Sequence, residues 1–287
     1  MNDCVCCGKN DFSEIRKTSC LLVPVYLCNN CGLSMSGKNE LEMRQKLEEL
    51  YKSDYWSKMK NVDKVIESNY NDLDSAFVRT RIKSQIDYCK NYLKPKSKLL
   101  EIGCGFGINI FELEKIGLDV MGVEPDSRNV KLINKRLKNG ICHTGFWEEF
   151  ETDKKFDVIW FSHSLEHFVR PDISLKKASK HLNQNGIIFI EIPNTENDIR
   201  LESSITHNPH TFHFTKKSVM ELVESCGFTI VSCDLFNRKR NTKEKLIRGL
   251  EKYGGLKSKY APYHFYKTND GTIANEIRLI LQNNDTN

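Results

Sequence analysis

The hydrophobic positions from residue 98 onward fall into short continuous runs, separated by stretches with helical spacing. Continuous apolar runs bounded by turn residues predict strands buried on both faces, as in a parallel sheet. The predicted strands cover residues 99–102, 120–123, 141–144, 156–161, 187–192, 228–231 and 277–281. The predicted helices between them cover residues 108–116, 127–138, 172–182 and 217–226. This alternation predicts an α/β fold with a mainly parallel central sheet.

The remaining residues suggest a division of the chain into three parts. Residues 1–36 form a cysteine-rich segment, and residues 37–95 contain two helical patterns, at 39–55 and 78–93, that would cover the cleft of the core. The second pattern ends before Pro95, which cannot continue a helix. The α/β core then occupies residues 96–287 and contains a basic insertion at about 237–272 that ends in aromatic residues.

Composition narrows the class of protein without choosing a function. The 287 residues are 28% charged, with a mean hydropathy of −0.51, and no apolar run approaches membrane-spanning length. The first residues lack signal-peptide character, so we expect a soluble, cytoplasmic protein. The net charge of +5 is small for a nucleic-acid binder and suits an anionic small-molecule partner.

A glycine-rich turn follows the first predicted strand. Gly103, Gly105 and Gly107 separate this strand from a helical pattern, and the next strand ends in Glu124. In such a βα unit the backbone amides and the helix N-terminus face a nucleotide, and the acid can bind both ribose hydroxyls. An NAD-binding domain would use the same geometry, although the third glycine stands one position early for that fingerprint.

The segments Glu101–Gly107, Gly122–Asp126, Phe156–Trp160 and Gly186–Asn194 together resemble the class I S-adenosylmethionine-dependent methyltransferases. The resemblance implies a Rossmann-like sheet of seven strands and S-adenosylmethionine as the cofactor. Phe146 and Trp147 would stack on the adenine, although aromatic residues at this place can equally belong to the core. The residues expected to bind the cofactor are Glu101, Gly103, Cys104, Gly105, Gly107, Glu124, Pro125, Phe146, Trp147, Phe161 and Ser162.

Two Cys-x-x-Cys-Gly motifs lie in the N-terminal segment, and they contain Cys4, Cys7, Cys28 and Cys31. Four thiolates at this spacing predict a tetrahedral structural zinc site in a small ribbon-like module. Cys6 could replace Cys4 as a ligand, and a disulfide pair is the alternative to zinc. Because so short a module has almost no core, zinc would supply most of its folding energy.

The chemistry is expected where the strands of the core end. His163, Glu166 and His167 follow the fourth strand and would share one side of a helix start, and His210 and His213 lie beyond the fifth strand. This arrangement resembles the metal sites of ubiquinone O-methyltransferases and small-RNA 2′-O-methyltransferases. The resemblance implies that His163, Glu166, His167 and His210 are catalytic and hold a second divalent metal, with His213 as a substitute ligand.

The departure from those families is His163, where they have a glutamate. A histidine in place of this glutamate makes the site less anionic and would shift its preference from magnesium toward manganese, iron or zinc. The alternative without a metal is that Glu166 and His167 buttress the turn and a histidine acts as general base.

The sequence therefore predicts an O-methyltransferase acting on a small polar acceptor, anionic or sugar-like, such as a sugar or phosphorylated metabolite. One rival is an RNA methyltransferase that grips RNA through the zinc module and the basic insertion. Another is a non-catalytic, cofactor-binding partner subunit. The sequence indicates no oligomeric state.

Overall fold

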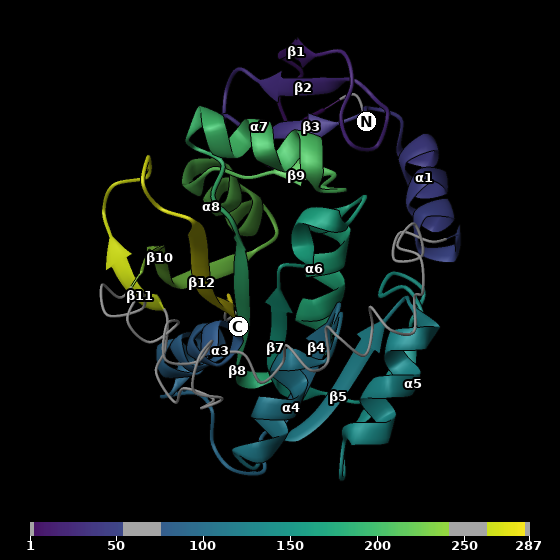
Figure 1. The fold of residues 1–287 in the computed structure, drawn as a ribbon, viewed down its shortest axis with the longest axis vertical. Coiled ribbons are helices and arrows are strands. Elements are labelled where there is room, and N and C mark those ends of the chain that lie inside the picture. The colour runs from purple at the N-terminus through teal and green to yellow at the C-terminus, as the bar shows by residue number, and fades with distance from the viewer. Residues whose placement is uncertain (1–2, 54–75, 241–262, 285–287) are drawn as a thin grey trace, which may run out of the picture.

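The computed structural model describes residues 3–53, 76–240 and 263–284, and its largest feature is a twisted sheet (Figure 1). Eight described strands form this sheet in the order β11-β10-β12-β8-β7-β4-β5-β6. The strands are β4 (Lys98–Ile102), β5 (Asp119–Glu124), β6 (Ile141–Thr144), β7 (Phe156–Ser162), β8 (Leu182–Pro193), β10 (Phe228–Arg240), β11 (Tyr263–Thr268) and β12 (Glu276–Asn283). Five neighbouring strands, β8, β7, β4, β5 and β6, are parallel to one another. The other three, β12, β10 and β11, pair antiparallel.

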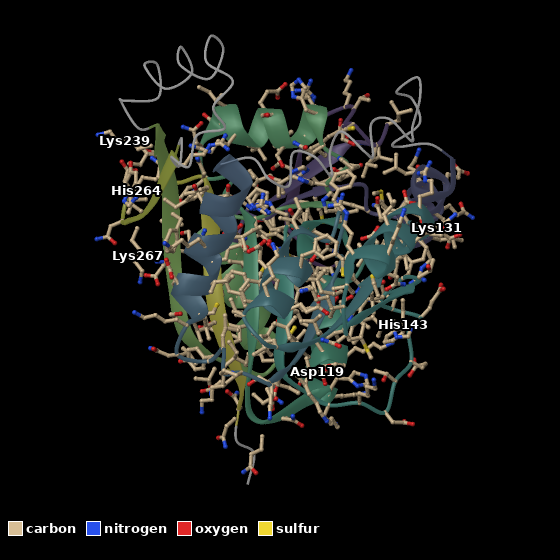
Figure 2. All side chains as sticks on the ribbon, turned by 60° about the horizontal axis from the view of Figure 1, so that its bottom comes forward. Asp119, Lys131, His143, Lys239, His264 and Lys267 are labelled. Carbon is tan, nitrogen blue, oxygen red and sulfur yellow. The ribbon has the colours of Figure 1, made fainter. Side chains whose placement is uncertain are left out.

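The predicted seven strands are all present, but the sheet has eight. β10 continues to Arg240, and β11 pairs with its second half, so strands occupy both ends of the predicted basic insertion. Figure 2 shows Lys239 and His264, which form one of these pairs, on this edge of the sheet, with Asp119 and His143 toward the other edge. Residues 241–262 of the insertion, and the last residues of the helical pattern predicted at 39–55, lie outside the described residues.

Helices cover both faces of this sheet because neighbouring strand residues point to opposite sides. Leu99 packs toward one face, with α3 (Ala76–Cys89), α4 (Ile108–Lys115) and α5 (Ser127–Arg136). Leu100 packs toward the other face, with α6 (Pro171–Lys180) and α8 (Lys216–Ser225). The result is the three-layered Rossmann-like architecture expected from the sequence.

The N-terminal segment forms a second, smaller sheet that the core completes. β1 (Phe12–Arg16), β2 (Val25–Cys28) and β3 (Ser34–Ser36) pair antiparallel, and β3 then pairs with β9 (Phe212–His213) from the α/β core. The side chains of this module are continuous with the main core, since Leu33 and Met35 share one cluster with Phe212 and Phe214. The apolar side chains of the module therefore belong to the same core as those of the larger sheet.

Two further helices frame the cleft between the sheets. α1 (Glu40–Ser53) follows the module, and α7 (Asp198–His207) lies between β8 and β9. Residues 163–167 do not begin an α-helix, since only Leu165–His167 form a single turn of 3-10 helix, η1. The tighter turn follows a left-handed backbone at His163, with φ of 52°.

Candidate active site

The glycine turn after β4 needs glycine for two different reasons. Gly103 has a φ of 78°, and a Cβ there would lie 2.6 Å from the Cβ of Ser164, so the chain crosses η1 closely. Gly105 has a φ of 52°, but a Cβ there would meet nothing within 4 Å. Gly105 thus presents open backbone to a cavity, as the turn of a nucleotide site must.

Two buried acids support this turn. Glu124 accepts hydrogen bonds from the backbone N–H groups of Gly105 (2.8 Å) and Asp126 (3.0 Å). Burial raises the pKa of Glu124 to about 7, and Glu124 lines the cavity. Glu101 lies beneath the turn, where it accepts a hydrogen bond from the Nδ2 of Asn109 (3.0 Å) and burial raises its pKa to about 8.

A cavity of about 630 Å³ extends from the glycine turn to η1 and α7. Of the residues predicted to bind the cofactor, those that line it are Gly103, Gly105, Glu124, Pro125, Phe146 and Trp147. Those that are not among its lining residues are Glu101, Cys104, Gly107, Phe161 and Ser162. The carboxyl ends of β4 and β5 thus meet at one end of the cavity, where the prediction placed the cofactor.

The aromatic residues predicted at the adenine have different environments. Trp147 is 2% exposed, and its Nε1 donates to the backbone carbonyl of Ser174 (3.2 Å), so most of its ring belongs to the core. Phe161 is fully buried in the core, and Ser162 accepts a hydrogen bond from Gln85 (3.0 Å). Phe146 is the half-buried aromatic residue of the set that lines the cavity.

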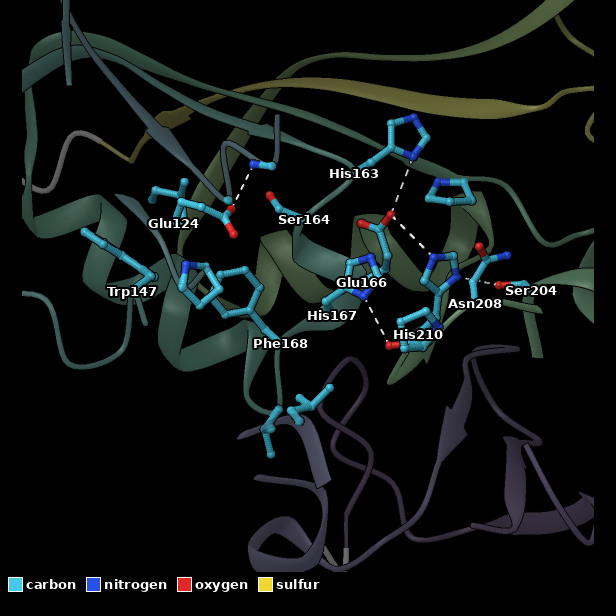
Figure 3. Close-up of a pocket in the computed structure, with 18 of the residues that line it drawn as sticks. Glu124, Trp147, His163, Ser164, Glu166, His167, Phe168, Ser204, Asn208 and His210 are labelled. Atoms are coloured by element: carbon cyan, nitrogen blue, oxygen red, sulfur yellow. Dashed lines mark hydrogen bonds and ion pairs between the residues drawn. The ribbon is translucent and has the colours of Figure 1, made fainter. Parts of the chain in front are cut away.

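Three predicted catalytic residues meet at the other end of the cavity (Figure 3). One ligand atom each from Glu166, His167 and His210 lies within 4.8 Å of the others, and we call this group the trio. Oε1 of Glu166 lies 3.5 Å from Nδ1 of His163, and within the described part of the chain neither carboxylate oxygen has a closer hydrogen-bond partner. Burial disfavours the charged form, but His163 outweighs burial and lowers the pKa of Glu166 to about 2, so the carboxylate is charged and can serve as a metal ligand.

Hydrogen bonds fix the orientation of the two histidines in the trio. Nδ1 of His167 lies 3.1 Å from the carbonyl oxygen of Pro209, so Nδ1 carries the proton. Burial lowers the pKa of His167, which leaves the ring neutral and its Nε2 with a free lone pair.

A longer chain of hydrogen bonds sets the proton of His210. The Ser36 hydroxyl donates to the backbone carbonyl of His210 (3.0 Å), so the Nε2 of His213 must donate to Ser36 (3.3 Å). Ser204 then donates to the Nδ1 of His213 (2.8 Å) and accepts from the Nδ1 of His210 (2.8 Å). Burial lowers the pKa of both histidines to about 3, so both are neutral, as this chain requires.

This series of hydrogen bonds leaves the Nε2 of His210 unprotonated, and Nε2 lies 4.0 Å from a carboxylate oxygen of Glu166. Both ring nitrogens of His213 form hydrogen bonds, to Ser36 and Ser204, so neither is available to a ligand. His213 instead helps to orient His210 through the shared Ser204 hydroxyl. A hydrogen bond on the far nitrogen is how proteins orient a metal-binding imidazole.

His163 lies beside the trio with different partners. Its ring nitrogens lie 3.5 Å from Glu166, 3.2 Å from Glu191 and 3.4 Å from Glu276. Burial and the Arg81 charge oppose its protonation, but the carboxylates outweigh them and raise its pKa to about 10. The structure therefore gives His163 the environment of a buried cation, which distinguishes it from the neutral His167 and His210.

Beneath His163 is a buried ion pair that the sequence did not lead us to expect. Arg278 on β12 and Glu191 on β8 are both fully buried and lie 2.5 Å apart. Gln85 on α3 also donates to Glu191, and Arg81 lies 3.5 Å from it. The available signal was a single charged residue inside each apolar strand run, at 187–192 and at 277–281.

In the N-terminal module, the four predicted zinc ligands are clustered. One ligand atom each from Cys4, Cys7, Cys28 and Cys31 lies within 4.8 Å of the others. The closest sulfur pairs are Cys4 with Cys31 (3.5 Å) and Cys7 with Cys28 (3.6 Å). Four sulfurs in a compact group match the donor set of a structural zinc site.

The sheet, the glycine turn and the acid at the end of β5 define a nucleotide-binding α/β domain of the methyltransferase type. The chain belongs to the methyltransferase domain family, whose sequence profile matches residues 75–233. The predicted enzyme class, an S-adenosylmethionine-dependent methyltransferase, is thereby confirmed for this domain, in place of an NAD-binding domain.

Two of the proteins that are similar in sequence to this chain are named as O-methyltransferases. A stretch of 97 residues is 33% identical to a ubiquinone biosynthesis O-methyltransferase of Pelagibacter ubique, covering 32% of this chain and 40% of that protein. The human mitochondrial ubiquinone biosynthesis O-methyltransferase is 28% identical over 134 residues, which cover 42% of this chain and 35% of that protein. The chain thus matches less than half the length of each of these relatives.

Solved structures share the fold at lower identity. The plantazolicin methyltransferase BamL, in complex with a triazolic desmethylPZN analog and SAH, has a TM-score of 0.52 and 14% identity, covering 86% of this chain and 100% of that one. A SAM-dependent methyltransferase of Thermotoga maritima has a TM-score of 0.51 and 19% identity, covering 74% and 94%. No helix among the described residues is long and apolar enough to cross a membrane.

Proposed function

We propose that this protein transfers the methyl group of S-adenosylmethionine to a hydroxyl oxygen of a small acceptor. The family match supports methyl transfer, and the names of the two relatives support oxygen as the atom that accepts the methyl group. The observation that carries the proposal is the trio, in which two neutral histidines and a buried, charged carboxylate line the same cavity as the glycine turn.

The cofactor would lie at the end of the cavity formed by Gly103, Gly105, Glu124, Pro125 and Phe146. Glu124 holds the turn through Gly105 and has a carboxylate at the cavity wall, in the position from which an acid binds ribose hydroxyls. Because the sulfonium is already activated, the protein has to align the acceptor oxygen with the methyl carbon and handle the hydroxyl proton. The oxygen attacks the methyl carbon, the carbon–sulfur bond breaks, and its electron pair stays on sulfur.

The trio would deal with the hydroxyl proton. Glu166, His167 and His210 fit a divalent ion, because one carboxylate and two neutral imidazoles are a donor set that manganese, iron and zinc accept. Such an ion would supply Lewis acidity that lowers the pKa of an acceptor hydroxyl. Without an ion, the Nε2 lone pair of a neutral imidazole of the trio would accept the hydroxyl proton as a general base.

The cysteine cluster would hold a separate, structural zinc. Four sulfurs leave no open position for chemistry, and the module that they close presents Ser36 to the segment carrying His210. The role that we propose for Cys4, Cys7, Cys28 and Cys31 is therefore to fix one wall of the active site.

The acceptor in this proposal is not restricted to a sugar. The two relatives described above are named for ubiquinone biosynthesis, so their names give a sugar no support. No observation on the described residues favours the two alternatives, an RNA methyltransferase and a non-catalytic, cofactor-binding partner subunit.

Metal analysis of Glu166→Gln tests the proposal. The wild type should carry one more equivalent of manganese or zinc than the variant, while both keep the cysteine-bound zinc and bind S-adenosylhomocysteine equally. Glu149→Gln is the matched control, since Glu149 lines the cavity but stands with Arg44, away from the trio. Turnover of S-adenosylmethionine with hydroxyl acceptors should fall in Glu166→Gln alone, and equal metal content and turnover in all three proteins would refute the proposal.

A further inference from the structure

We propose that the hydroxyl oxygen of Ser164 binds the methyl-bearing sulfonium of the cofactor, and so favours the charged donor S-adenosylmethionine over its neutral product, S-adenosylhomocysteine. The inference rests on the proposed function, because it takes the glycine turn as the cofactor end of the cavity and the trio as the acceptor end. It adds a cofactor contact that the sequence did not predict.

Ser164 lies where the two ends of the cavity meet (Figure 3). On one side, a Cβ on Gly103 would lie 2.6 Å from the Cβ of Ser164, so Ser164 packs directly against the glycine turn. On the other side, it begins η1 and stands two residues before Glu166 of the trio. The side chain of Ser164 lines the cavity between these two neighbours.

Direct methyl transfer brings this junction and the reacting groups together. The acceptor oxygen, the methyl carbon and the sulfur have to lie in line when the methyl group moves. Glu124 and Gly105 form the end of the cavity where the ribose would lie, and the trio forms the end where the acceptor hydroxyl would lose its proton. The methyl carbon therefore has to lie between the two ends, and Ser164 is the residue that joins them.

The hydroxyl of Ser164 has no hydrogen-bond partner among the described residues. Its Oγ is buried, and the residue as a whole is 6% exposed. A serine that begins a helix usually caps it with its hydroxyl, but Ser164 makes no such bond to η1. A buried hydroxyl without a partner lowers the stability of a protein, and a bound ligand can satisfy it.

A serine oxygen suits the reactive part of the cofactor. Its lone pairs attract the positive charge of the sulfonium and the polarised hydrogens of the methyl group, as in other C–H···O contacts. S-adenosylhomocysteine has lost both the charge and the methyl group, so this attraction is absent from the product. The contact therefore strengthens donor binding relative to product binding, which limits inhibition by the product.

Three ligands that differ at this centre test the proposal. S-adenosylmethionine carries the methyl sulfonium, S-adenosylhomocysteine a neutral sulfur, and sinefungin a carbon with an ammonium group. Titration calorimetry measures their dissociation constants with the wild type, Ser164→Ala and the control Ser174→Ala. Within the described part of the chain, Ser174 also has a buried Oγ without a partner, but it lies on α6 and outside the cavity lining.

Ser164→Ala should weaken the binding of S-adenosylmethionine about 3–10-fold. The ammonium of sinefungin can donate a full N–H hydrogen bond, so its affinity should fall about 10–100-fold. Binding of S-adenosylhomocysteine should stay unchanged, and Ser174→Ala should bind all three ligands like the wild type. Without ligand, Ser164→Ala should unfold at the same urea concentration as the wild type or at a higher one, because it loses a hydroxyl that has no partner in the protein.

The proposal requires both charged ligands to lose more affinity than S-adenosylhomocysteine in Ser164→Ala, and every other pattern of losses overturns it. A ligand-free Ser164→Ala that is destabilised or does not fold would also overturn it, since the hydroxyl would then serve the fold. A wild type that binds none of the three ligands refutes the proposed function. Wild-type binding with an unchanged preference in Ser164→Ala refutes this inference alone.

Discussion

Replacing Ser204 by alanine should weaken metal binding at the trio although Ser204 itself contacts no metal. Its hydroxyl connects the Nδ1 of His210 to the Nδ1 of His213, at 2.8 Å from each. Without it, His210 has no acceptor for its Nδ1 proton and can move that proton to Nε2. The lone pair that faces Glu166 would then be lost.

The size of the effect follows from these two contacts. Removing the hydrogen bond that orients a metal-binding imidazole typically costs about 10–100-fold in metal affinity. Each buried histidine nitrogen left without a partner should also lower the free energy of unfolding, by about 1–3 kcal/mol. Both changes should appear together, because one hydroxyl satisfies both rings.

Calorimetric titration of manganese or zinc into chelator-treated protein, with urea unfolding in parallel, measures the two effects. Ser203→Ala is the matched control, since Ser203 is the exposed neighbour of Ser204 on α7 and lines the same cavity. A Ser204→Ala variant that is destabilised but binds metal as tightly as the wild type would show that the hydroxyl serves only the fold. The assignment of His210 would then be wrong.

Three further predictions concern other parts of the structure. Glu124→Ala should weaken S-adenosylmethionine binding by about 1.5–3 kcal/mol, the value of a charged hydrogen bond, and unchanged affinity in calorimetry would remove Glu124 from the cofactor site. Replacing Cys28 and Cys31 by serine should remove about one zinc per chain and lower the thermal midpoint, and full zinc content in that variant would contradict the cysteine site. The third prediction concerns pH, because the pKa of His163 is raised to about 10. The ion pairs of protonated His163 should stabilise the folded protein fully below pH 6.5. That stabilisation should be lost as the pH rises through 10. The difference in free energy of unfolding between the wild type and His163→Asn, which tolerates the left-handed backbone, should therefore shrink between pH 6.5 and 10.5, and a constant difference would argue against a charged His163.

Local patterns in the sequence were sufficient to predict most of the fold. The strand before Gly103 and the strand that ends in Glu124 are continuous apolar runs, and such runs are buried whatever surrounds them. β11 was missed because Tyr263–Thr268 mixes aromatic and basic residues, and it becomes a strand only by pairing with the polar end of β10. Edge strands of this kind depend on a neighbour that no local pattern reveals.

The candidate site was predictable as a set of residues but not as an arrangement. His210 and His213 lie three residues apart and look equivalent in the sequence, yet Ser36 and Ser204 occupy both nitrogens of His213 and free one nitrogen of His210. These partners come from β3 and α7, so the distinction exists only in the folded chain. His163 likewise acquires its charge from Glu276, Glu166 and Glu191, and two of these carboxylates come from strands that are distant in the sequence.

The pairing of β3 with β9 has a consequence for how the chain is made. Ser36 and His213 are 177 residues apart, so the outer edge of the module emerges from the ribosome long before its partner exists. At about 5–20 residues per second, the edge stays open for roughly 10–35 seconds. During that time β3 is an unpaired strand edge next to free thiols, open to pairing with other nascent chains. Zinc on the four cysteines that we propose as its ligands would cover the thiols during this time, but only β9 closes the edge of β3.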